Sequence, residues 1–252
     1  FGRRIRALLD ADGVVLGLGA QVPEPTTLAI AQLDEGGAAT YRFLMEGTSS
    51  AAVTPELALA HADPVASALH VGTLGLVLEP VADAVVALVA AASDDQLVMV
   101  DPNCRPSVMT GSAVFADTLA ALLPRADLVK VSGDDLAFLF PGQEPLAAAT
   151  ELQESSGSVV LFTDGADAVH VLAAGVDVVV DVPAVRVVDT VGAGDSFSGG
   201  VLAWWQRAGR GRADVADIDT VVEAVRFGVQ VAGLTCQRAG ANPPFAQEVG
   251  WA

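Results

Sequence analysis

Cysteine is scarce in this sequence: the chain has two, Cys104 and Cys236, which lie far apart. A disulfide scaffold needs several cysteines in a short chain, so that class of protein is excluded. Two thiols in 252 residues are typical of proteins that work in a reducing compartment. The sequence therefore predicts a cytoplasmic location.

Basic residues are also few. The chain has 13 Lys and Arg against 31 Asp and Glu, which gives a formal net charge of −18. A surface with this charge repels nucleic acid and anionic lipid. We therefore expect neither nucleic acid nor a membrane among the partners, and an anionic substrate must rely on donors within its own site.

Long apolar runs and aromatic residues are missing as well. The stretch VADAVVALVAAA is too short to cross a bilayer and contains Asp83. No basic segment with a cleavage site opens the sequence. Only 5% of residues are aromatic although 52% are hydrophobic, so the core must consist mainly of Val, Ala and Leu. This length and composition predict one α/β domain with a sizeable core.

The sequence starts with FGRRIRALL, without Met and inside a helical pattern that has Ile5, Leu8 and Leu9 on one face. A native chain rarely starts within a helix. We therefore expect an N-terminal segment to precede Phe1.

Three apolar stretches follow this helix, at 13–20, 26–34 and 39–46. Gly36 and Gly37 mark a turn between the last two. No helical pattern separates the three stretches, so the sequence predicts a small antiparallel β unit over about 13–45.

From about residue 55, short apolar runs alternate with helical patterns, which is typical of a parallel sheet with crossover helices. The predicted helices cover 56–62, 80–93, 112–123, 133–139 and 145–155. The stretches 168–175 and 177–188 are predicted to add antiparallel strands, and two helices at about 194–208 and 215–235 close the chain. No linker or repeat is apparent, so residues 1–252 are predicted to form a single domain.

Polar residues directly follow the four predicted parallel strands, and ligands of open α/β sheets bind at such carboxyl ends. The groups are Gly72 and Thr73, then Asp101, Asn103 and Arg105, then Lys130 and Ser132, then Thr163 and Gly165. Arg105 is interpreted as a clamp for phosphate or sugar, with a structural pair to Asp101 as the alternative. Lys130 either contacts phosphate or points outward beside its strand.

The stretch DTVGAGDSFSGG, at 189–200, joins the end of an apolar run to a helical pattern that begins near Gly194. Gly192 and Gly194 allow a tight turn and close approach of a ligand to the backbone. The first N–H groups of a helix, here those of Ala193, Gly194 and Asp195, lack helical partners and attract anions. This pattern predicts a phosphate site with a carboxylate at its edge, although Asp195 could also be an ordinary helix-capping acid.

Several motifs together resemble the ribokinase-like, phosphofructokinase-B family of sugar kinases. DTVGAGDSF resembles its C-terminal signature, DPNCRPSVM its D-x-N-x-R strand end, and VVLFTDGADAV its nucleotide-binding T-x-G turn. DLVKVSGDDLAFLFPG resembles the N-x-x-E region, with Ser132 and Asp135 in place of Asn and Glu, and AGLTCQRAGANPP resembles the closing helix and loop. The resemblance covers nearly the whole chain. It implies a three-layer α/β sandwich with a mostly parallel central sheet, covered by a small β-sheet lid at 13–45.

The resemblance also implies roles for individual residues in an ATP-dependent kinase. Asp195 matches the catalytic base, and Gly192, Ala193 and Gly194 match the anion hole. The implied nucleotide-binding residues are Lys130, Ser132, Thr163, Gly165 and Gly228, while Asn103 and Arg105 face substrate or phosphate. Asp135 would organise Mg²⁺ through water, and Asp189 and Gly240 resemble positions that hold K⁺. The expected cofactors are therefore ATP and Mg²⁺, with K⁺ as a further candidate.

The motif KVS favours fructokinase within this family, with ribokinase, 2-keto-3-deoxygluconate kinase and adenosine kinase as alternatives. The family's first strand, which carries a sugar-binding Asp, and its Gly-Gly motif would precede Phe1. A nucleotide or sugar sensor without activity is the alternative from another class. The apolar residues Leu28, Ile30 and Phe43 suggest that the lid pairs with a second lid in a homodimer.

Overall fold

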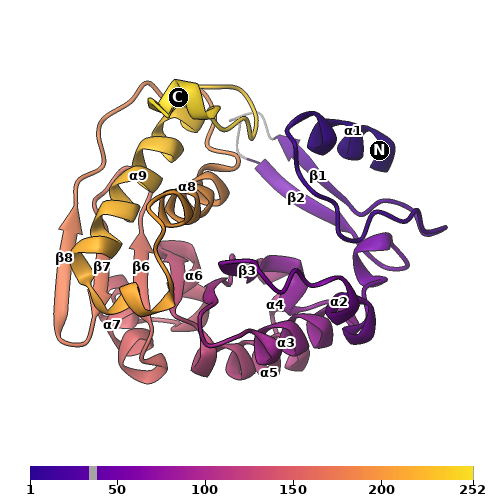
Figure 1. Cartoon of the computed structure of the whole chain (residues 1–252), viewed down its shortest axis with the longest axis horizontal. Helices are drawn as coiled ribbons and strands as arrows, with labels where there is room; N and C mark the ends of the chain where they lie inside the picture. The colour runs from indigo at the N-terminus through magenta and orange to yellow at the C-terminus, as the bar shows by residue number, and fades with distance from the viewer. Residues whose placement is uncertain (34–38, 252) are drawn as a thin grey trace.

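The protein is an α/β structure with two separate sheets (Figure 1). The computed structural model describes residues 1–33 and 39–251. The strands are β1 (Leu28–Leu33), β2 (Ala39–Leu44), β3 (Ala68–Gly72), β4 (Leu97–Asp101), β5 (Leu128–Ser132), β6 (Val159–Thr163), β7 (Val169–Ala173) and β8 (Val176–Val180). The helices are α1 (Gly2–Ala11), α2 (Pro55–His61), α3 (Val81–Ala91), α4 (Pro106–Met109), α5 (Ala113–Leu122), α6 (Gly133–Leu139), α7 (Pro145–Ser156), α8 (Ala193–Arg207) and α9 (Ile218–Cys236).

The main sheet has the strand order β3-β4-β5-β6-β7-β8. The first four strands are parallel, and β7 and β8 are added antiparallel, as the sequence predicts. The strands read as continuous apolar runs because both faces of the sheet are covered; every residue of β4 is buried. The carboxyl ends of β3, β4, β5 and β6 therefore meet at one edge.

Helices cover both faces of this sheet and give three layers. Val98, Val100, Val129 and Val160 point into one core, which also holds side chains of α3, α5, α6 and α7. The alternate strand residues, including Met99, point into a second core with α8 and α9. In Figure 1, α8 and α9 lie together beside the sheet, away from α3 and α5. Among residues 1–33 and 39–251, no helix is both long and apolar enough to cross a bilayer.

The predicted β unit is only partly correct. β1 and β2 pair antiparallel, with Leu28 opposite Leu44, and the predicted turn at Gly36 and Gly37 lies outside the described residues. The strand predicted at 13–20 is wrong: this stretch contains turns and no strand. Gly13 adopts φ of +75°, a left-handed conformation that does not fit a strand. The stretch 13–20 is instead a connection between α1 and the two-stranded sheet.

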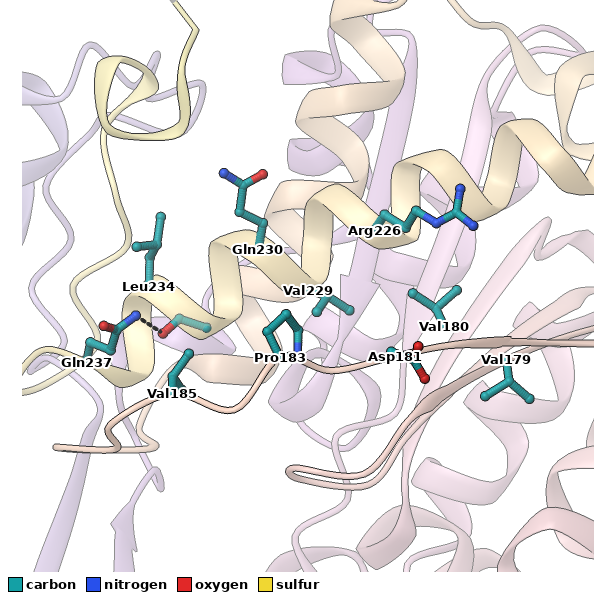
Figure 2. A pocket seen from close by; sticks show the side chains of 11 residues that line it. Val179, Val180, Asp181, Pro183, Val185, Arg226, Val229, Gln230, Leu234 and Gln237 are labelled. Carbon is teal, nitrogen blue, oxygen red and sulfur yellow. Dashed lines mark hydrogen bonds between the residues drawn. The ribbon is translucent and has the colours of Figure 1, made fainter.

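The strand predicted at 177–188 is also shorter than expected, because β8 ends at Val180. The next residues, DVPAVRVV, form no strand. Pro183 has no N–H group to donate to a neighbouring strand, which disfavours continued pairing. Residues 181–188 instead run along α9 toward the N-terminus of α8 (Figure 2).

Two glycines let α8 and α9 approach each other closely. A Cβ added at Gly200 would lie 2.9 Å from the Cα of Gly228. A Cβ added at Gly228 would lie 2.8 Å from Val201 Cγ2 and 2.9 Å from the carbonyl oxygen of Phe197. The nucleotide contact expected at Gly228 is therefore not supported, because this residue is buried in the helix crossing.

We predict that Gly228→Ala destabilises the protein by about 1–3 kcal/mol, because the added methyl group forces the packed helices apart. Urea denaturation would measure the change. Gly199→Ala is the matched control: it lies in the same helix pair, and nothing lies within 4 Å of its added Cβ. This control should leave stability unchanged or raise it by up to about 1 kcal/mol. Equal midpoints for wild type and Gly228→Ala would contradict the proposed packing role.

Candidate functional site

The candidate site lies where the parallel strands end beneath α8. Side chains of a strand alternate between its two faces. Asp101 therefore points to the same face as Met99, and Lys130 to the same face as Leu128, which is the face covered by α8 and α9. By the same alternation, Thr163 on β6 and His70 on β3 share this face.

The N-terminus of α8 supplies backbone donors above this edge. Gly192 precedes the helix with φ of +78°, and a Cβ there would lie 2.6 Å from the Cβ of Ala241. The first helical bond runs from Ser196 N–H to the carbonyl of Gly192. Ala193 N–H donates to Thr190 at 3.2 Å, so the expected set of three donors is reduced. Gly194 and Asp195 retain N–H groups that precede the first helical bond.

Asp195 lies in the first turn of α8 and is exposed. Its negative charge acts on two groups of the neighbouring strands, His70 and Asp101, and at each of them it favours a higher pKa. The net pKa of His70 is nevertheless lowered, because desolvation among the surrounding protein outweighs the attraction of Asp195 and Lys130 adds repulsion. His70, Asp195 and Lys130 therefore belong to one electrostatic cluster, and sequence reasoning did not identify His70 as a member.

Lys130 lies in this cluster and forms a buried ion pair with Asp101. The two side chains are 6% and 4% exposed, and Lys130 Nζ lies 3.1 Å from Asp101 Oδ2. The alternative in which Lys130 points outward is therefore wrong. The pKa of Asp101 is raised to about 6, mainly by desolvation, against the opposing attraction of Lys130.

Arg105 does not pair with Asp101. Its guanidinium donates to the backbone carbonyls of Asn103, at 3.2 Å, and Cys104, at 3.0 Å. Asn103 itself has φ of +41°, so the chain turns sharply after β4. Arg105 thus stabilises this turn through one nitrogen of its guanidinium, Nη1.

Asp135 joins the turn after β4 to the start of α6. One carboxylate oxygen accepts from Cys104 N–H, and the other accepts from the N–H and hydroxyl of Ser132. Ser132 accepts in return from Asp135 N–H, which completes a capping box. Asp135 is 2% exposed, so its carboxylate fits direct binding of a metal ion poorly. Within the described chain, no three His, Cys, Asp or Glu side chains could hold a metal ion.

Asp189 connects the approach to α8 with the loop after α9. Its oxygens accept from Val191 N–H at 3.0 Å and from Gly240 N–H at 2.7 Å. These bonds lower the pKa of Asp189. The structure therefore brings together the two residues that the sequence associates with K⁺, and a direct hydrogen bond joins them.

A pocket that sequence analysis did not find lies between α9 and residues 179–185 (Figure 2). Its volume is about 440 Å³. Pro183 lies beside Val229 on α9 and Val185 lies near Gly233, while Gln230 lies on the same helix and Gln237 follows its end. The polar end of Gln237 donates to the carbonyl of Gly233 at 3.1 Å. No sequence pattern marks this pocket, because it forms between segments that meet only in the fold.

Thr163 and Gly165 lie at the carboxyl end of β6. Thr163 Oγ1 donates to the carbonyl of Val131 at 3.3 Å, and Ser132 pairs with Thr163 across the sheet. Gly165 adopts φ of +58°, which fits a tight turn. The T-x-G turn thus lies next to the strand end that carries Lys130.

We predict that Asp135→Ala destabilises the protein by about 1–3 kcal/mol, because it leaves the buried N–H of Cys104 without its acceptor and removes a capping box. Chemical denaturation measures this change. Asp134→Ala is the control, because the neighbouring acid is exposed in the same turn; its effect should stay within about 0.5 kcal/mol. Equal losses in the two variants would exclude the proposed role of Asp135 as a connection between the loops.

The fold and the site define the class: an α/β protein whose α8 N-terminus offers free backbone donors, with the carboxylate of Asp195 in its first turn and the buried amine of Lys130 against it. The sequence matches the pfkB family carbohydrate kinase over residues 1–248. The chain belongs to the pfkB family of carbohydrate kinases.

Relatives within this family carry fructokinase names. A fructokinase from Rhizobium leguminosarum bv. trifolii is 30% identical over 207 residues, which cover 81% of this chain and 62% of that protein. Fructokinase-1 from Zea mays is 27% identical over 256 residues, covering 98% of this chain and 77% of that protein. The chain thus spans less than two thirds of the Rhizobium protein's length.

A solved structure agrees with this placement. The fructokinase from Xylella fastidiosa with bound ATP superposes with a TM-score of 0.83 at 25% identity, covering 96% of this chain and 77% of that one. The predicted three-layer α/β fold with a small second sheet is therefore confirmed.

Proposed function

We propose that this protein transfers the γ-phosphoryl group of ATP to a sugar hydroxyl, and that the sugar is fructose in preference to ribose, 2-keto-3-deoxygluconate or adenosine. The observation that carries the proposal is the meeting of the α8 N-terminus, Asp195 and the buried Lys130 at one strand edge. The fructokinase names of the relatives support the choice of sugar.

In the proposed reaction, Asp195 accepts the proton of the sugar hydroxyl as its oxygen attacks the γ-phosphorus. An exposed carboxylate is a weak base, but proton removal comes late in phosphoryl transfer, so positioning matters most. The N–H groups of Gly194 and Asp195 then stabilise the negative charge of the phosphoryl oxygens. Lys130 adds a positive charge beside them.

Mg²⁺ bound to ATP would neutralise part of the phosphate charge. Because the carboxylate of Asp135 is buried, it would act on Mg²⁺ only through a bridging water molecule, and ATP itself would supply most of the metal ligands. Asp189 and Gly240 support a K⁺ proposal indirectly, since they order the backbone behind the anion hole. Carbonyl groups of this loop would supply the ligands of such an ion.

We propose that the adenine ring occupies the pocket between α9 and residues 179–185. The chain from Pro183 to Gly192 leads directly from this pocket to the anion hole. Backbone bonds from Val188 and Asp189 to the carbonyl of Cys236 hold that segment against the end of α9. Thr163 and Gly165 would then contact the phosphates that lie between the adenine pocket and the anion hole.

The sugar would lie between the strand edge and the sheet of β1 and β2, near Asn103 and Arg105. The fructokinase names of the relatives support a catalytic protein over a sensor, and a pure binder has no need of the acid at Asp195. Pairing of two lids in a homodimer and a cytoplasmic location stay predictions.

We predict that Asp195→Asn lowers kcat by about 10²–10⁴-fold while leaving nucleotide affinity nearly unchanged, because the amide cannot accept the proton. Coupled ADP-release kinetics and calorimetry with ADP measure the two effects. Asp219→Asn, in the first turn of α9, is the control and should keep wild-type kcat. Full turnover by Asp195→Asn would remove this residue as the base.

A panel of fructose, ribose, 2-keto-3-deoxygluconate and adenosine tests the substrate. We expect the highest kcat/KM with fructose. Preference for another sugar would correct the substrate, whereas absence of ADP release with every sugar would favour the sensor.

We predict that Gly233→Leu raises the KM for ATP by about tenfold or more, because the side chain fills the pocket proposed for adenine. A Cβ at Gly233 would meet only Val185 Cγ1, at 3.7 Å, so the backbone need not move. Ala120→Leu on the exposed side of α5 is the control. An unchanged KM for ATP would place adenine elsewhere.

A further inference from the structure

Lys130 is the only lysine in the sequence; the other 12 basic residues are arginines. It is also buried, with 4% of the residue exposed. Lysine presents a compact point charge, whereas the guanidinium of arginine is a wide planar fork. The single lysine therefore occupies a position where a small buried cation fits.

The sheet register holds Asp101 opposite this lysine. Met99 pairs with Leu128 and Val100 with Val129, so the same register brings Asp101 beside Lys130. The Nζ–Oδ2 distance of 3.1 Å completes the contact. Both groups are fixed by neighbouring strands and not by long flexible loops, so the geometry of the pair is set by the sheet.

Lys130 also touches the anion hole. A Cβ added at Gly194 would lie 3.0 Å from Lys130 Nζ. Any larger residue at position 194 would therefore press against the ammonium group. Lys130 therefore lies against Gly194, whose N–H group is one of the backbone donors that precede the first helical bond of α8.

Asp101 is incompletely satisfied in this arrangement. Its second oxygen, Oδ1, is buried and has no hydrogen-bond partner within the described part of the chain. A buried ion pair is weak evidence for stability, because desolvation offsets the attraction between the charges. The Lys130–Asp101 ion pair lies at the anion hole and leaves Asp101 Oδ1 without a partner. A functional role explains this arrangement better than a contribution to folding stability does.

We propose that Asp101 is the positioning residue for Lys130, holding its ammonium against Gly194 so that it meets the phosphoryl group during transfer. This inference rests on the proposed kinase function. Asp101 thus orients the donor through the ion pair, and it does not touch the reacting atoms.

Burial raises the pKa of Asp101 to about 6, so its carboxyl group is ionised at neutral pH. The neighbouring negative charges of Asp135 and Asp195 contribute to this raised pKa, and Lys130 opposes it. Before ATP binds, the ammonium of Lys130 is paired with Asp101 alone among the described carboxylates. The arriving phosphates provide a competing negative charge at the same point.

A double-mutant cycle on kcat tests the inference. We expect Lys130→Met to lower kcat by about 100-fold or more and Asp101→Asn by about tenfold or more. If Asp101 acts through Lys130, the double variant should match Lys130→Met within about twofold. Additive losses, or wild-type kcat in Asp101→Asn, would overturn the proposal.

A second measurement separates positioning from folding. Affinity for ADP alone should change by no more than about twofold in Asp101→Asn, whereas affinity for ADP with aluminium fluoride and sugar should fall at least about tenfold. Calorimetry measures both. A structural role alone would weaken both complexes equally, and that result would also overturn the proposal.

Asp101→Glu is a second variant that tests the proposal if Asp101→Asn does not fold. It retains the charge but moves it by one methylene, so a positioning role predicts a lower kcat in a folded protein, and wild-type kcat would contradict it. Asp127→Asn is the matched control, because Asp127 forms ion pairs with Arg125 and Arg212 outside the site. It should lower the melting temperature without changing kcat.

The outcomes also distinguish failure of the proposed kinase function from failure of the proposed role of Asp101. Wild-type protein without turnover on any sugar would overturn the kinase proposal and this inference together. Turnover in wild type, loss in Asp195→Asn and no loss in Asp101→Asn would overturn this inference alone.

Discussion

The position of the α8 N-terminus over the ends of β4 and β5 is the constraint on which the site depends. Gly200 and Gly228 let α8 approach α9 closely, and the core around Phe197 and Trp205 fixes the pair against the sheet. A helix N-terminus offers unpaired N–H groups only where its first turn points. The packing of two helices therefore decides where an anion can bind.

The second organising feature is a balance of charge around a single amine. The chain carries a formal charge of −18, and the carboxylates of Asp135 and Asp195 both act electrostatically on that of Asp101 in the site. Lys130 and the helix N-terminus are the local positive groups that offset them. Because the amine is buried, its charge is screened less than that of an exposed residue. An overall acidic protein thus still offers a local positive potential at this edge of the sheet.

The sequence predicted much of the scaffold because the signals involved are local. The alternation of buried strands with helices gave the parallel order, and the motif around Gly192 and Asp195 identified the start of α8. The predictions failed at positions where tertiary contacts decide the local structure. The stretch 13–20 is apolar but contains no strand, and Gly228, which was expected to contact the nucleotide, lies instead in the crossing of α8 and α9. The role of Asp135 in organising Mg²⁺ through water stays a prediction, and its oxygens accept hydrogen bonds from Cys104 and Ser132.

The sequence by itself determined the fold class, the strand ends that carry polar groups and the glycine-rich loop that begins α8. These depend on periodicity and on glycine, which act over a few residues. Only the tertiary structure decided that Lys130 pairs with Asp101 and not with solvent, that Arg105 caps its own turn, and that residues 179–185 form a pocket with α9. The reason is physical: the partner of a buried charge is set by which strands and helices pack together, and no local pattern encodes that distance.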